Sequence, residues 1–64
     1  MGYNIFIEKY DGKKGWFGYF EQGGFVFGYS QTDSRFYTDY DEAKRDCDKL
    51  NSFLSVKKAE IISR

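Results

Sequence analysis

The chain has 64 residues, with ten acidic and ten basic side chains, no histidine, no proline and one cysteine. At this length a single domain over residues 1–64 is expected, with a small core that buries only about 60% of the unfolded surface. Without histidine the chain can form neither a Ser-His or Cys-His nucleophile nor a His-ligated zinc site, and one cysteine excludes an internal disulfide. The balanced charge argues against nonspecific duplex binding, which depends on excess Lys and Arg.

The sequence also predicts the cellular location of the protein. No stretch approaches the roughly 18 apolar residues of a membrane-spanning helix, so no membrane association is expected. The first residues lack the basic and then apolar pattern of a secretory signal peptide. Together with the lone thiol of Cys47, these features predict a cytoplasmic protein.

The first thirty residues predict strands joined by tight turns, because they are rich in aromatic and β-branched side chains. We expect Asp11-Gly12 and Gly23-Gly24 each to form the centre of a two-residue hairpin turn, of type I′ for the first. The segment 35–37 is a candidate for a short additional strand at an edge. The expected strands of the hairpins cover residues 3–10, 16–21 and 25–30.

From Ala43 onward the apolar spacing becomes that of a helix. We expect a helix from about residue 40 to residue 53, with Thr38 or Asp39 as its N-cap. Cys47 falls on the apolar stripe, where a buried and unreactive thiol is expected. The stripe, with steps of four, three and four residues, consists of Ala43, Cys47, Leu50 and Leu54.

Residues 56–62 are open to two interpretations. Their β-branched side chains favour a last strand, whereas a helix continued to Ile61 would keep that residue on the apolar stripe. We favour the strand. The predicted fold class is α+β, a two-layer sandwich in which an antiparallel meander of three to four strands packs on one helix and a C-terminal strand follows, in the order β-β-β-(β)-α-β.

The predicted turns set a register in which Ile7 opposes Trp16 and Phe20 opposes Phe27. Side chains alternate across a sheet, so the more apolar set should face the helix, and Trp16, Phe27 and Leu50 should be well buried. That first set comprises Tyr3, Ile5, Ile7, Trp16, Phe20, Phe25, Phe27 and Tyr29. The opposite set comprises Phe6, Glu8, Tyr10, Phe17, Tyr19, Glu21 and Val26.

One helix covers only one face of a small sheet, so the opposite set should face solvent. An exposed apolar patch on a small domain usually marks an interaction site. A structural interpretation is the alternative, because aromatic residues favour strands, stiffen a sheet through cross-strand pairs, and here could cover Gly18 and Gly28. The candidate partner-binding residues are Phe6, Tyr10, Phe17, Tyr19 and Val26.

The segment Lys14-Gly15-Trp16-Phe17-Gly18-Tyr19-Phe20 resembles the aromatic strand of RNA-recognition and cold-shock domains, and Gly24-Phe25-Val26-Phe27 echoes it. In those families strand aromatics stack on bases, so the resemblance implies binding to single-stranded nucleic acid. The predicted element order differs from both families, and the basic residues are scattered along the chain. We therefore interpret the motif as convergence and keep nucleic-acid binding as the second hypothesis.

The leading hypothesis is a small non-enzymatic module that binds a protein partner by occlusion through its aromatic face. Self-association as a homodimer through the same face would fit this hypothesis. The size and character of the chain are typical of inhibitors that phages and mobile elements direct against host machinery such as CRISPR or restriction systems.

No catalytic residue, cofactor or metal ligand is predicted, because no spacing singles out an acid–base pair and so short a chain leaves little room for a ligand pocket. The acidic residues around 39–48 lack the glycine that an EF-hand calcium loop needs at its sixth position. We interpret them as a solvated helix surface, with the acidic patch of a DNA mimic as the alternative.

Overall fold

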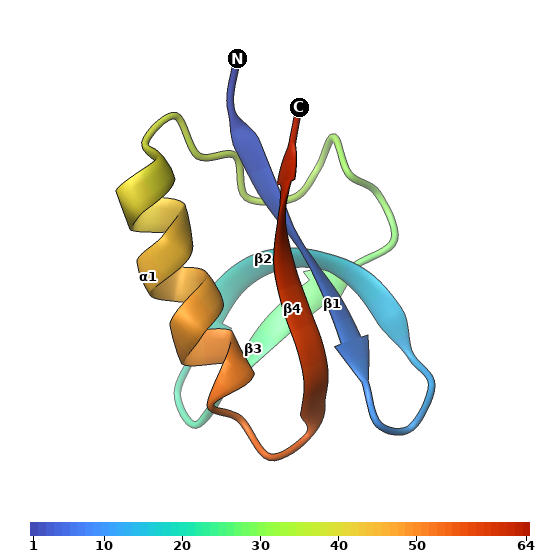
Figure 1. The fold of residues 1–64 in the computed structure, drawn as a ribbon. Coiled ribbons are helices and arrows are strands. Elements are labelled where there is room, and N and C mark those ends of the chain that lie inside the picture. The colour runs from blue at the N-terminus through green and yellow to red at the C-terminus, as the bar shows by residue number, and fades with distance from the viewer.

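The computed structural model describes all residues 1–64 and contains one four-stranded antiparallel sheet with one helix. The strand order is β3-β2-β1-β4, and α1 lies along one side of the sheet (Figure 1). The predicted meander with a C-terminal strand is confirmed, and residues 56–62 belong to that strand. The elements are β1 (Tyr3–Lys9), β2 (Lys14–Glu21), β3 (Gly24–Gly28), α1 (Tyr40–Asn51) and β4 (Val56–Ser63).

Helix α1 starts as predicted and ends earlier. Asp39 is its N-cap and accepts a hydrogen bond at Oδ1 from the Asp41 N–H at 3.1 Å. The helix ends at Asn51 because the chain turns at Ser52, whose N–H bonds back to the Lys49 carbonyl. Leu54 therefore lies outside the helix and is 97% exposed, so its place on the buried stripe was wrong. The helix is too short and too polar to cross a membrane.

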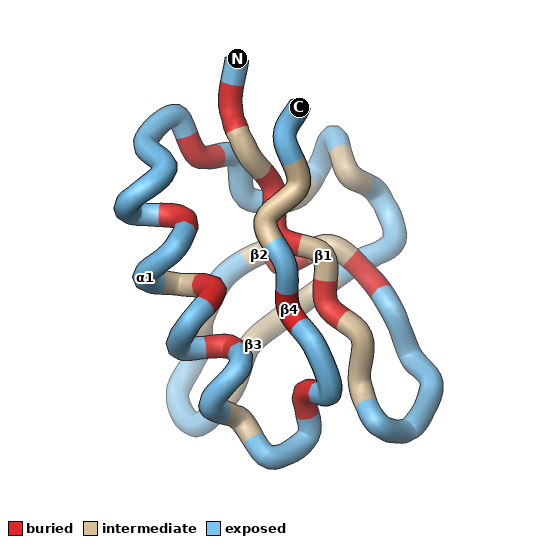
Figure 2. Tube along the Cα trace, in the orientation of Figure 1, coloured by how far each residue is buried: buried red, intermediate tan, exposed pale blue.

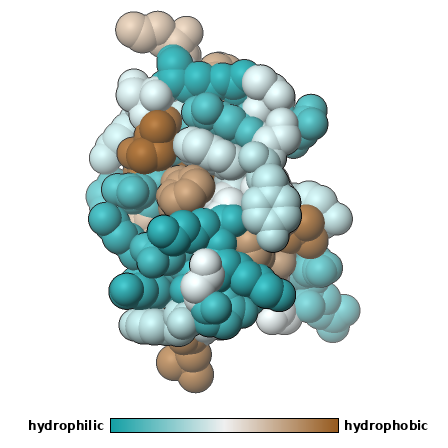
Figure 3. Space-filling model, turned by 90° about the vertical axis from the view of Figure 1, so that its right-hand side faces the viewer, coloured by the Kyte–Doolittle hydropathy of each residue, from teal (hydrophilic) through white to brown (hydrophobic).

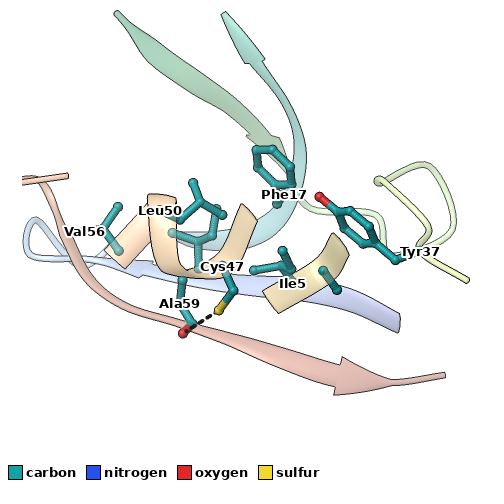
Figure 4. Close-up of a cluster of buried hydrophobic side chains, with 9 residues drawn as sticks. Ile5, Phe17, Tyr37, Cys47, Leu50, Val56 and Ala59 are labelled. Carbon is teal, nitrogen blue, oxygen red and sulfur yellow. Dashed lines mark hydrogen bonds between the residues drawn. The ribbon is translucent and has the colours of Figure 1, made fainter. Parts of the chain in front are cut away.

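The core fills the space between α1 and the sheet (Figure 4). The helix presents the predicted stripe to it, and its buried positions lie on the side that faces the strands (Figure 2). Leu50 is fully buried as predicted, whereas Trp16 and Phe27 are only half-buried. The nine buried hydrophobic residues are Ile5, Ile7, Phe17, Tyr37, Ala43, Cys47, Leu50, Val56 and Ala59.

The first hairpin turn is longer than predicted. The Gly12 N–H bonds to the Lys9 carbonyl, and the Lys9 N–H bonds to the Lys13 carbonyl, so three residues lie between the last paired positions. Gly12 has a φ of 92°, but Asp11 does not have a positive φ, which excludes the predicted type I′ turn. The geometry is that of a type I turn followed by a glycine bulge.

This extra turn residue exchanges the faces of two neighbouring aromatic residues. Phe6, and not Ile7, opposes Trp16. A shift of one residue turns each side chain to the other face of the sheet. Phe17 therefore points into the core and is 1% exposed, while Trp16 points away from the helix.

A β-bulge at Gly18 restores the predicted faces in the rest of β2. Phe17 and Tyr19 pair with adjacent residues of β3, so Gly18 between them has no partner of its own. The extra residue interrupts the alternation of the strand. As a result Phe17 and Phe20 face the same side, with ring centroids 4.7 Å apart.

The second turn is centred on Gln22-Gly23 instead of Gly23-Gly24, because Glu21 pairs with Gly24. Phe20 consequently opposes Phe25 and not Phe27. This register differs from the predicted one by an even number of residues, so the β3 side chains keep their predicted faces.

The loop between β3 and α1 does not form the additional edge strand considered for residues 35–37. Only Tyr37 makes a β-bridge, with Tyr3. The Tyr37 hydroxyl donates a hydrogen bond of 2.5 Å to Asp46 Oδ2 on α1. Burial, this hydrogen bond and the negative charge of Asp46 raise the pKa of Tyr37 well above its ordinary value of about 10.

Alkaline pH should destabilise the protein through Tyr37. Above about pH 10 the unfolded chain loses the Tyr37 proton while the folded chain still holds it, so the free energy of unfolding should fall as pH rises. Urea denaturation from about pH 8 to about pH 11 measures this. Tyr37→Phe should lose about 1–2 kcal/mol at neutral pH and then decline less steeply. Parallel declines in the two proteins would contradict the role of Tyr37.

Candidate functional site

The sheet face turned away from α1, named the outer face, carries aromatic and aliphatic side chains from every strand. Phe6 and Trp16 lie directly opposite each other, and their rings meet edge to face with centroids 4.9 Å apart. On the side of the molecule opposite α1, apolar side chains appear as separate spots among hydrophilic ones (Figure 3). The apolar and aromatic members of the outer face are Phe6, Trp16, Tyr19, Val26 and Ile62.

The structure brings together three of the five predicted partner-binding residues. Phe6 and Val26 are half-buried on the outer face, and Tyr19 is 57% exposed there. Tyr10 is 70% exposed but lies in the first turn and not on the sheet. Phe17 was placed on this face wrongly, because the longer first turn directs it into the core.

A hollow of about 460 Å³ lies between the outer face and the loop that follows β3. Trp16 and Tyr19 line it from β2, and Tyr29 lines it from the start of the loop. Asp33 and Arg35 add one acidic and one basic side chain from the same loop. The hollow therefore combines ring faces with hydrogen-bonding groups, which is the composition of a recognition site.

Two glycines leave space in this hollow. Gly18 is the bulge residue of β2, and Gly28 pairs with Trp16 across the strands. A Cβ placed on Gly28 would meet no heavy atom within 4 Å, and one placed on Gly18 would meet only the Val26 backbone. No ring atom of a non-adjacent residue lies within 4 Å of the Cβ position of either glycine, so the alternative in which aromatic side chains cover Gly18 and Gly28 is wrong. The glycines that lie against aromatic rings are Gly15, which is covered by Phe27, and Gly2, which is covered by Phe36.

The wall of the hollow is fixed by a buried polar side chain, Asn4. Its Nδ2 donates to the Arg35 carbonyl at 2.8 Å and to Ser34 Oγ at 3.1 Å, and its Oδ1 accepts from Gln31 Nε2 at 3.3 Å. The Arg35 N–H in turn donates to the Phe17 carbonyl at 2.9 Å. Every buried side-chain nitrogen and oxygen has a hydrogen-bond partner, so the loop and β2 form a fixed frame.

The electrostatics of the site are mild. Arg35 stacks over the Tyr37 ring at 4.9 Å and lies 3.9 Å from Glu42, so its charge is already partly engaged. Asp33 and Arg35 are the charged residues of the lining. No group of three or more Cys, Asp or Glu side chains comes together in a way that could hold a metal ion.

The sequence did not predict the contributions of Trp16, Tyr29, Asp33 and Arg35, which line the hollow, or of Asn4, which holds its wall. Trp16 and Tyr29 were expected in the helix-facing set. Asp11-Gly12 also permits a three-residue turn over residues 10–12, and a prediction of that turn would have placed Trp16 on the outer face. Asn4 bonds to residues about thirty positions away, and no local pattern predicts such a contact. Comparison with protein families, curated proteins and solved structures found no match to this chain.

Proposed function

We propose that the protein is a non-enzymatic binding module whose outer face and hollow dock a protein partner. The observation that carries this proposal is the preformed hollow with Trp16, Tyr19, Tyr29 and Arg35 around it. Trp, Tyr and Arg are the residue types that supply most of the binding energy in protein interfaces. A side chain that protrudes from the partner would enter the space above Gly28 and be held between the rings.

We propose occlusion as the mode of action, since the chain is small and its outer face carries apolar or aromatic side chains from all four strands. Inhibition of host machinery such as a CRISPR or restriction system, as phages and mobile elements practise it, is the biological role we assign to this occlusion. A cytoplasmic setting belongs to the same proposal, because the buried free thiol of Cys47 suits a reducing compartment.

Binding to single-stranded nucleic acid is the second candidate, and the exposed ring of Tyr19 beside Trp16 favours it. Such sites combine stacking aromatics with a basic groove. Here the lining holds one acid and one base, and the chain has no net charge. The charge distribution therefore supports a protein partner over a nucleic acid.

Filling the hollow should weaken partner binding without unfolding the protein. Gly28→Val adds a side chain where no atom lies within 4 Å, at a residue without a positive φ. Valine is favoured in strands, so the melting temperature should stay nearly unchanged. Partner affinity should fall by about tenfold or more, as expected for the loss of one interface anchor.

The matched control is Gly24→Val. Gly24 lies on the same strand and the same face, has equally open space, and does not line the hollow. Tagged wild-type protein and both variants would be used for capture from lysate of the source cell, with and without nuclease, and then titrated against the captured partner. A partner retained by Gly24→Val and lost by Gly28→Val supports the proposal. Equal retention by both variants would place the site elsewhere, and loss on nuclease treatment would favour nucleic acid.

A further inference from the structure

The two edges of the sheet differ in how they are protected. At the edge formed by β4, Asn51 Nδ2 donates to the Ala59 carbonyl at 3.0 Å, and Asn51 Oδ1 accepts from the Ala59 N–H at 2.8 Å. The Cys47 thiol donates a hydrogen bond to the same carbonyl, drawn as a dashed line in Figure 4. The distance from Sγ to the carbonyl oxygen is 3.2 Å. The helix side chains thus take the place of a further strand. Lys57 and Lys58 add charges, which also discourage pairing at an edge.

Strand β3 forms the other edge and has no such protection. Its sequence has no charge and no proline, and the uncharged stretch extends over residues 22–32. Glu21 and Gly24 flank a two-residue turn and form a hydrogen-bonded pair. Hydrogen-bonded and non-hydrogen-bonded positions alternate along β3 from that pair, so the amides of Phe25 and Phe27 point away from β2. No loop or side chain bonds to these amides. An open edge of this kind is a template for another strand.

The sequence of β3, Gly24-Phe25-Val26-Phe27-Gly28, reads the same in both directions. If two copies pair antiparallel about a two-fold axis at Val26, Phe25 of each copy opposes Phe27 of the other. Gly24 then opposes Gly28, and Val26 opposes itself. Each Phe25–Phe27 pair uses the outward-pointing amides and exchanges both of its N–H···O bonds. Aromatic pairs face each other on the core side, and no like charges meet.

We propose that the protein forms a two-fold symmetric homodimer through antiparallel pairing of the β3 strands about Val26. In this pairing each residue of β3 faces a residue of the same type in the other copy. An unrelated strand would not reproduce this match, so the match identifies a second copy as the occupant of the edge. The two sheets would join into one continuous sheet. Because the two-fold axis is perpendicular to that sheet, both outer faces lie on the same side, with the two hollows near the axis.

Charge at position 26 tests the pairing. Wild-type protein, followed by sedimentation equilibrium over rising concentration, should approach twice the monomer mass. Val26→Lys and Val26→Glu should each remain monomeric, because like charges would face each other directly across the axis. An equimolar mixture of the two variants should recover the dimer. A wild-type protein that stays monomeric, a dimer that persists in Val26→Lys alone, or a mixture that stays monomeric would overturn the proposal.

Cross-linking tests the register without added charge and stands even if a charged variant fails to fold. In a Cys47→Ala background, Val26→Cys places two thiols in a non-hydrogen-bonded pair, whose Cα separation of about 4.5 Å suits a disulfide. Mild oxidation should therefore give a covalent dimer. Gly24→Cys in the same background is the control, since its own copies lie too far apart to link. Efficient linking of Gly24→Cys alone, or none of Val26→Cys, would contradict this register.

Discussion

Phe17→Ala should lower the free energy of unfolding by about 3–5 kcal/mol, as truncation of a large buried aromatic residue does. Phe17 is 1% exposed, and its ring packs against Phe20 inside the core. A domain of 64 residues has little stability in reserve, so the variant should be largely unfolded at room temperature. Urea denaturation followed by circular dichroism measures the effect.

Trp16→Ala is the matched control, since it removes a larger aromatic side chain at the adjacent position. Trp16 is half-buried on the outer face and contacts Phe6. It should cost less than Phe17→Ala, because Trp16 packs against Phe6 on the outer face and belongs neither to the buried core nor to the side chains packed against it. If Trp16→Ala were instead the more damaging substitution, the first hairpin would have the two-residue turn and the opposite faces.

Trp16 and Phe17 show how much of this fold the sequence pattern predicts. The strands, the helix start at Asp39 and the burial of Leu50 follow from local signals and were confirmed. Asp11-Gly12 is compatible with a two-residue and a three-residue turn, which differ in whether Asp11 takes a positive φ. That single dihedral angle decides whether Trp16 or Phe17 enters the core, and composition alone does not determine it.

The candidate site depended on a second feature that periodicity does not encode. The bulge at Gly18 returns Tyr19 to the outer face after the first turn has shifted the register, so the prediction for Tyr19 was right only because two departures from it cancel. The structural alternative had aromatic side chains covering Gly18 and Gly28, whereas both glycines leave open space in the hollow. The wall of that hollow is held by contacts between residues far apart in sequence, which no local pattern encodes.

Asn4→Ala should be the most damaging polar substitution, with a loss of about 2–4 kcal/mol. Asn4 is fully buried, and its removal leaves the Arg35 carbonyl without its donor inside the protein. A buried group that loses its partner costs about 1–3 kcal/mol, and Ser34 Oγ loses a donor as well. The loop should detach from the sheet, so hydrogen exchange should show loss of protection at the Arg35 amide, which bonds to Phe17.

Asn51→Ala is the control that separates the loss of stability in Asn4→Ala from its loss of the binding site. Asn51 also makes two hydrogen bonds to the backbone, but it does so with Ala59 at the β4 edge, away from the hollow. Both variants should be less stable than the wild type, and only Asn4→Ala should lose both protection at Arg35 and affinity for the partner. Equal loss of affinity in both would show that binding follows global stability. If the Arg35 amide kept its protection in Asn4→Ala, the loop would be held by its other contacts. Asn4 would then not be the residue that fixes the wall of the hollow.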